Sequence, residues 1–146
     1  FIGLLAGVPR AVFSAGTLEG DAVTYLTTSY LYGPGGPAVT CSSGAVAAAG
    51  RPFVHGYEIY LEKATLSYSS GGTPLTVFTA DGKSFIPELP GGGDPIAAFG
   101  DELQAAVDGV RSGKEPDLLS GTLARNALVM CHREIESVRT GGTVKI

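Results

Sequence analysis

The sequence predicts an α+β domain: a two-layer, open-faced, predominantly antiparallel β-sheet of about six or seven strands with helices packed on one face. Residues 11–86 contain strand-like runs rich in Val, Thr, Tyr and Phe, separated by glycine- and proline-rich turns. Residues 96–138 then hold two consecutive segments with helical spacing. Strands that follow one another without helices favour antiparallel pairing, and consecutive helices at the end favour covering one sheet face.

The first part of the chain predicts the end of a helix followed by three strands. Residues 1–8 finish a helix, because the residue before Pro9 is pushed out of the helical region. Residues 11–15 and 21–32 then form strands. Residues 38–49 are small, and we interpret them as a closely packed strand, although the pattern alone also allows a helix.

The middle of the chain shows the clearest strand alternation, over residues 53–68, which we predict to be one strand. His55, Tyr57 and Ile59 fall on one side of it, and Glu58 and Tyr60 on the other. The next two strands, residues 75–80 and 83–86, are joined by a hairpin turn at Asp81-Gly82.

Two helices and a short closing strand complete the prediction. The first helix follows the cap Asp94-Pro95. The second ends at Gly141, a residue that readily adopts the left-handed conformation. Residues 143–146 form the last strand. The apolar stripes of the two helices comprise Ile96, Phe99, Leu103, Ala106, Val107 and Val110, and Leu123, Ala124, Ala127, Leu128, Cys131, Ile135 and Val138.

Length and charge limit the possible functions. The 146 residues fit one domain, and no cluster of Lys or Arg in this chain of net charge −4 could neutralise a row of phosphates. Nucleic acid is therefore not an expected partner. No apolar run is long enough to cross a membrane, so a soluble, cytoplasmic protein is expected. The chain starts at Phe1 without a methionine and is interpreted as a piece of a longer protein.

Few residues are candidates for chemistry. His55 and Tyr57 share a strand face, where both can hydrogen-bond the hydroxyls of a sugar or polyol; cross-strand packing is the competing interpretation. Glu58 and Glu62 share a strand face and are expected at a solvated strand edge or an intersubunit contact, and His132 is expected in a charged cluster on a helix flank. Cys41 and Cys131 are interpreted as buried thiols, and no metal site is expected.

The order of several short motifs resembles the C-terminal half of the Gfo/Idh/MocA oxidoreductases, the glucose-fructose oxidoreductase and inositol dehydrogenase group. The pieces that carry the resemblance are residues 4–12, residues 55–66 (which include Gly-Tyr-Glu-Ile and Glu-Lys-Ala-Thr-Leu), residues 99–116 and residues 124–144. Ala64 departs from the pattern, because many members have glycine there.

The resemblance implies a parent enzyme whose Rossmann domain, upstream of Phe1, binds NAD or NADP. Residues 1–146 would be its substrate-binding and oligomerisation domain, forming a homodimer or larger homo-oligomer through the open sheet face. His55 and Tyr57 are then the expected substrate-binding residues, and no catalytic, cofactor-binding or metal-binding residue is expected in this chain, which alone would be inactive.

Two alternatives stay open at this stage. One is a free-standing, non-catalytic dimerisation or ligand-binding module. The other is a carbonyl-processing enzyme built on the sheet alone, with His55 as its base.

Overall fold

The computed structural model describes residues 1–146, apart from the side chain of Pro95. The chain divides into two compact units, one made of residues 1–48 and 102–146 and the other of residues 49–101. The described strands form two four-stranded antiparallel sheets. The predicted α+β class and the antiparallel pairing are confirmed, but the strands are split between two sheets where the sequence predicted one.

The first sheet has the strand order β3-β2-β1-β8. Its strands are β1 (Ala11–Glu19), β2 (Ala22–Leu31), β3 (Ala38–Gly44) and β8 (Val144–Lys145). Residues 38–44 are therefore a strand, which decides against the helical alternative. β8 adds the last residues of the chain to the edge of β1, where Val144 lies opposite Val12. The short helix α1 (Ile2–Ala6) ends before Pro9, as predicted.

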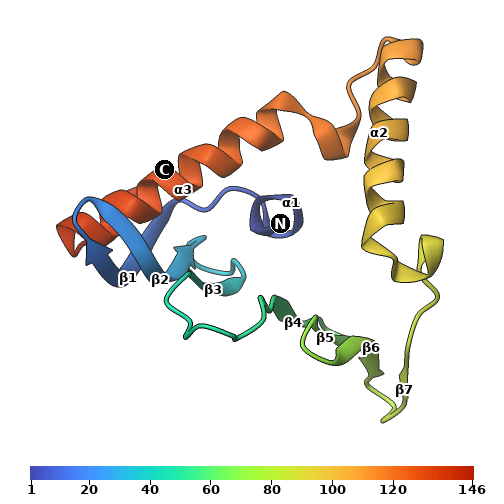
Figure 1. The fold of residues 1–146 in the computed structure, drawn as a ribbon, viewed down its shortest axis with the longest axis horizontal. Coiled ribbons are helices and arrows are strands. Elements are labelled where there is room, and N and C mark those ends of the chain that lie inside the picture. Colours follow the sequence, from blue (N-terminus) through green and yellow to red (C-terminus); the bar gives the residue numbers. More distant parts are fainter. The chain divides into compact units, whose positions relative to one another are not determined.

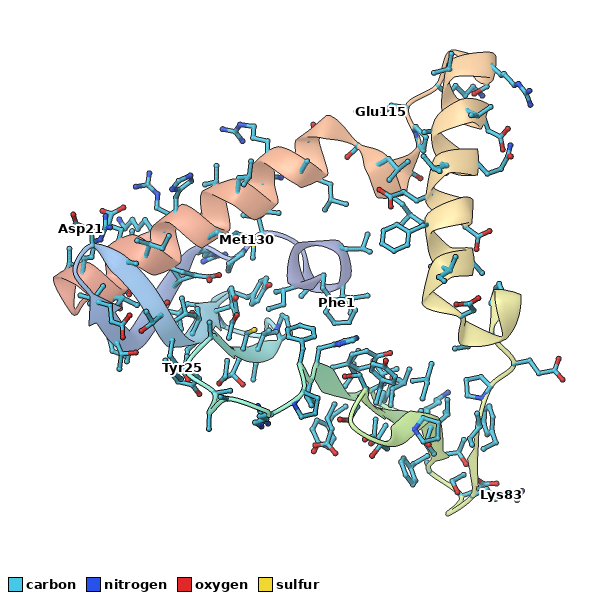
Figure 2. The ribbon with its side chains drawn as sticks, viewed as in Figure 1. Phe1, Asp21, Tyr25, Lys83, Glu115 and Met130 are labelled. Carbon is cyan, nitrogen blue, oxygen red and sulfur yellow. The ribbon has the colours of Figure 1, made fainter. Side chains whose placement is uncertain are left out.

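The helix α3 (Gly121–Thr140) packs on β1, β2 and β8 and covers one face of the first sheet (Figure 1). Met130 of α3, labelled in Figure 2, meets Val12 and Tyr30 in the buried core of this unit. The helix begins at Ser120, whose Oγ accepts a hydrogen bond from the backbone N–H of Leu123. It ends at Gly141 with φ 67°, which confirms the predicted left-handed cap.

The buried side of α3 differs from the predicted stripe. Leu128 is 64 % exposed, and Cys131 is exposed as well, so the expectation that Cys131 is a buried thiol is wrong. The helix instead buries Met130, Glu134 and Ser137. A stripe chosen by hydrophobicity misses this side because two of these three side chains are polar and find hydrogen-bond partners on the sheet.

The second unit holds the sheet β4-β5-β6-β7. Its strands are β4 (Gly56–Tyr60), β5 (Ala64–Ser69), β6 (Thr73–Thr79) and β7 (Ser84–Phe85). The hairpin predicted at Asp81-Gly82 joins β6 to β7, with Phe78 paired to Ser84. A short 3-10 helix, η1 (Pro90–Gly93), follows.

The single strand predicted over residues 53–68 is wrong, because the chain turns back within it. The backbone N–H of Leu61 donates to the carbonyl of Ala64, and β5 pairs antiparallel with β4. The alternation itself signals this turn. The aliphatic side chains Ile59 and Leu61 fall at odd positions, whereas Ala64 and Leu66 fall at even positions, and a continuous strand would not place all four on one face.

The helix α2 (Pro95–Ser112) starts where the sequence predicts, with the Asp94 carboxylate accepting a hydrogen bond from the backbone N–H of Ile96. Its predicted apolar stripe is exposed rather than buried, since Phe99 and Leu103 are 67 % and 70 % exposed. A second 3-10 helix, η2 (Asp117–Leu119), then leads to α3. Within the described residues, none of the helices combines the length and the apolar character that crossing a membrane requires.

Candidate functional site

The two predicted site residues lie close together in the second unit, on either side of Tyr68. The ring of His55 lies 5.6 Å from that of Tyr68, and the ring of Tyr57 lies 5.5 Å from it, measured between centroids. Phe53 continues the row, with its ring centroid 5.7 Å from that of His55. These separations are typical of aromatic packing. We call Phe53, His55, Tyr57 and Tyr68 the aromatic row.

Backbone pairing positions the members of this row. Tyr57 and Tyr68 are directly opposite each other in the β4-β5 ladder. His55 extends the ladder beyond β4, because its backbone N–H donates to Ser70 Oγ and its carbonyl accepts from the backbone N–H of Ser70. Alternation along β4 then places the side chains of His55 and Tyr57 on the same face.

Tyr68 is the site residue that the sequence analysis missed. A strand running through residues 53–68 puts Tyr57 and Tyr68 more than ten residues apart along one line, whereas the hairpin brings them side by side. The change in the apolar alternation between Leu61 and Ala64 is the signal that could have found it.

The strand β6 has a bulge next to Tyr68. Ser67 pairs with Thr76, and Ser69 pairs with Thr73. Between these two pairs, β6 therefore contains one residue more than β5. Pro74 lies in the bulge, which is where a strand tolerates a residue without a backbone N–H. Bulges of this kind often redirect side chains next to binding sites.

A depression of about 520 Å³ opens at this bulge, within the second unit. Its walls are mostly apolar, and its one ionisable side chain besides Tyr68 is Glu88. Gly92 and Gly93 also line the depression, and their φ angles of 67° and 78° are ones that side-chain-bearing residues rarely adopt. The lining residues are Tyr68, Pro74, Leu75, Ile86, Pro87, Glu88, Leu89, Gly92 and Gly93.

The other carboxylates near the aromatic row do not form a catalytic pair. Glu58 accepts a 2.8 Å hydrogen bond from the Tyr60 hydroxyl, and this bond raises the pKa of Tyr60. Glu62 lies in the turn between β4 and β5 rather than on the strand face beside Glu58, where we had expected it. Both residues are exposed to solvent, in agreement with a solvated surface.

The buried polar side chains of the first unit make structural contacts, among them the pair of Tyr30 and Glu134. The Tyr30 hydroxyl donates a 2.7 Å hydrogen bond to Glu134, and burial raises the pKa of this carboxyl. Burial likewise raises the pKa of the Cys41 thiol, which is half-buried in β3. Among the described residues, no group of three or more His, Cys, Asp or Glu side chains could hold a metal ion.

The exposed position of His132 agrees with the predicted charged flank of α3. Its neighbour Arg133 forms a salt bridge of 2.6 Å with Glu136 one turn later. Exposed pairs of this kind contribute little to stability, about 0.5 kcal/mol. We therefore assign no binding role to this side of the helix.

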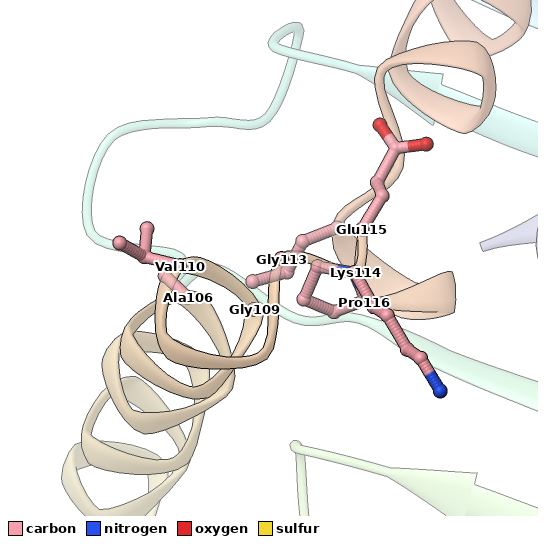
Figure 3. A pocket seen from close by; sticks show the side chains of 8 residues that line it. Ala106, Gly109, Val110, Gly113, Lys114, Glu115 and Pro116 are labelled. Atoms are coloured by element: carbon pink, nitrogen blue, oxygen red, sulfur yellow. The ribbon is translucent and has the colours of Figure 1, made fainter.

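A smaller depression, of about 370 Å³, lies where α2 ends (Figure 3). Figure 3 shows the charged ends of Lys114 and Glu115 directed away from each other. Glu115 is already engaged, because its carboxylate accepts a hydrogen bond from the backbone N–H of Gly121. With no converging polar groups, this depression is a weaker candidate than the one beside Tyr68.

Comparison with known proteins identifies a solved structure with a similar fold. No protein-family model and no curated protein matches the chain. A crystal structure described as a "putative oxidoreductase" from Bacteroides fragilis is similar over 99 % of this chain, with a TM-score of 0.65 and 16 % sequence identity. The match covers 49 % of that protein, so this chain spans about half of its length. At this identity the likeness shows a shared fold, that of one half of the longer protein.

Proposed function

We propose that the chain is the substrate-binding and oligomerisation domain of an NAD(P)-dependent oxidoreductase acting on a sugar, a polyol or a related hydroxy compound. The observation that carries the proposal is the likeness of nearly the whole chain to half of the protein described as a putative oxidoreductase. The resemblance of several short motifs to those of the Gfo/Idh/MocA group adds to it. In such an enzyme, hydride passes between a substrate carbinol carbon and a nicotinamide held by another domain.

In this proposal the aromatic row binds the substrate. Either ring nitrogen of His55 can donate or accept a hydrogen bond with a hydroxyl, and the Tyr57 hydroxyl can do both. Tyr68 between them offers an apolar ring face against which the C–H groups of a sugar can pack. The row would orient the substrate, while the nucleotide and the group that moves the proton would come from the other domain.

The uncovered face of the first sheet would be the oligomerisation surface. Because α3 covers one face, the side chains that alternate onto the other face include Phe13, Tyr25 and Leu31, all of which are partly exposed. Three large, partly exposed apolar side chains on one face of an antiparallel sheet are typical of a surface that pairs with a second protein surface.

Exchanging His55 for alanine tests the binding role. Isothermal titration with a panel of monosaccharides and polyols should reveal a ligand of this chain, and His55→Ala should bind it about tenfold more weakly, because one hydrogen bond is lost. His132→Ala is the matched control, since this histidine is exposed on α3 and should leave the affinity unchanged. Equal affinities of the wild type and His55→Ala would remove His55 from the site.

The reading frame upstream of Phe1 tests the oxidoreductase assignment. A strand, a Gly-x-Gly-x-x-Gly turn and a helix there would supply the nucleotide site, and the encoded protein should reduce NAD or NADP with the ligand found by titration. An open reading frame that starts near Phe1 would favour the non-catalytic ligand-binding or dimerisation module instead.

A further inference from the structure

The depression beside Tyr68 has a composition that a free sugar does not match. Pro74, Leu75, Ile86, Pro87 and Leu89 supply apolar walls. A free sugar presents hydroxyls on nearly every carbon, and each one buried against such walls without a partner costs free energy. The walls therefore favour a ligand part that is itself apolar.

The depression has few side chains with polar groups, namely Glu88 and Tyr68. Glu88 can accept hydrogen bonds from hydroxyl groups, and the phenolic hydroxyl of Tyr68 can donate or accept one. Tyr68 also belongs to the aromatic row, so it connects the hydroxyl-binding residues His55 and Tyr57 to the apolar walls. A ligand that spans both regions needs a hydroxylated part and an apolar part next to each other.

We propose that the depression is a subsite for the apolar substituent of the substrate, so that the site takes a sugar or polyol bearing an aromatic or aliphatic group, such as a glycoside, in preference to the free sugar. The inference rests on the proposed function, because it takes the aromatic row as the place where the hydroxylated part binds. Pro74, which lies in the bulge of β6, and Tyr68 both line this subsite.

Matched glycosides test the subsite directly on this chain. We would measure the affinities of the phenyl and methyl β-glycosides of glucose, galactose and mannose by isothermal titration. For at least one sugar, the phenyl compound should bind about tenfold more tightly, because its ring buries apolar surface that a methyl group lacks. Phenol alone, measured in parallel, should bind far more weakly than the phenyl glycoside.

Two variants locate the effect. Ile86→Ser makes one wall polar and should reduce the preference for the phenyl over the methyl glycoside at least fivefold. Ile86 is 64 % exposed, so this change should not unfold the protein. Leu61→Ser is the control, because Leu61 is a similarly exposed aliphatic residue outside the depression, in the turn after β4. Circular dichroism confirms that both variants are folded.

The outcomes separate this inference from the proposed function. Equal binding of phenyl and methyl glycosides, no binding of either, phenol binding as tightly as the phenyl glycoside, or an unchanged preference in Ile86→Ser would each overturn the subsite. His55→Ala should weaken both glycosides by the same factor. A phenyl preference that depends on Ile86, together with no effect of His55→Ala, would retain the apolar subsite and reject the hydroxyl-binding role of the row.

Discussion

Glu134 is buried against Tyr30, and the hydroxyl of Tyr30 donates a hydrogen bond to its carboxyl group. Burial disfavours the charged form and raises the pKa of Glu134 above its ordinary value of 4.5. The folded chain therefore keeps a proton on Glu134 at pH values where the unfolded chain has lost it. The free energy of unfolding should fall as the pH rises from the unfolded value through the folded one.

Replacing Glu134 with glutamine tests this pH dependence. The amide oxygen of Gln can still accept the hydrogen bond from Tyr30, and the variant carries no charge to bury. We expect Glu134→Gln to lose the fall in stability that starts near the ordinary glutamate pKa of 4.5, and to be at least as stable as the wild type once Glu134 has lost its proton. Urea unfolding at several pH values measures this. An unchanged pH profile would contradict the assignment.

Tyr30→Phe provides the complementary test. This variant removes the hydroxyl donor and leaves the carboxyl group of Glu134 buried without a hydrogen-bond partner. The free energy of unfolding should therefore drop by about 2 kcal/mol at neutral pH. The exposed Tyr60, whose hydroxyl also donates to a glutamate, is the matched control. Tyr60→Phe should change stability by less than about 0.5 kcal/mol.

Residue patterns could predict some of these contacts but not others. Gly141 and Asp94 were identified as caps because their roles depend on neighbours along the chain. Glu134 could not be placed on the buried side of α3, since its partner Tyr30 is 104 residues away. A charged residue in a sequence predicts exposure unless the distant partner is known.

Among the elements, α3 is fixed to the first sheet by Ser137. This residue is fully buried, its Oγ accepts a 2.8 Å hydrogen bond from the backbone N–H of Ser14, and its hydroxyl donates to the carbonyl of Gly142. The two-residue strand β8 pairs with β1 only at Ala11 and Val12. The backbone N–H of Ser14 therefore finds its hydrogen-bond acceptor in Ser137. One small polar side chain thus links the helix, the edge of the sheet and the final turn.

Ser137→Ala should therefore lower the free energy of unfolding more than the loss of one small hydroxyl group usually does. It leaves a buried backbone N–H and a carbonyl without this partner, and we expect a loss of about 2 kcal/mol in the free energy of unfolding. Thr140→Ala is the control, because the Thr140 hydroxyl donates to a carbonyl of its own helix in an exposed position. A loss below about 0.5 kcal/mol in Ser137→Ala would show that water replaces the serine.

Local patterns identified most elements, and failed where a long-range contact decides the structure. Hairpin chemistry at Asp81-Gly82 and the β-branched composition of β2 were sufficient to predict those strands. The orientation of α3 was not predictable, because its buried side is selected by hydrogen bonds to β1 and β2 as well as by apolar burial. For the candidate site, His55 and Tyr57 were found from one strand face, while Tyr68 required the register of the hairpin.

For the whole molecule, the uncovered face of the first sheet predicts self-association. Analytical ultracentrifugation of the wild-type chain should show a dimer or larger assembly. Phe13→Lys places a charge on this face and should weaken association at least tenfold, because the charge would have to be buried. Leu128→Lys is the control, since Leu128 is exposed on α3. A wild-type monomer would contradict the proposed oligomerisation role.

The left-handed glycines that line the depression would restrict how the proposed subsite can diversify. Any side chain introduced at Gly92 or Gly93 would be forced into an unfavourable backbone conformation, so point mutations cannot readily reshape that part of the lining. Changes of ligand preference should instead accumulate at Ile86 and Pro87, which line the same space. Relatives that accept different substituents would then be expected to vary at those two positions while retaining the glycines.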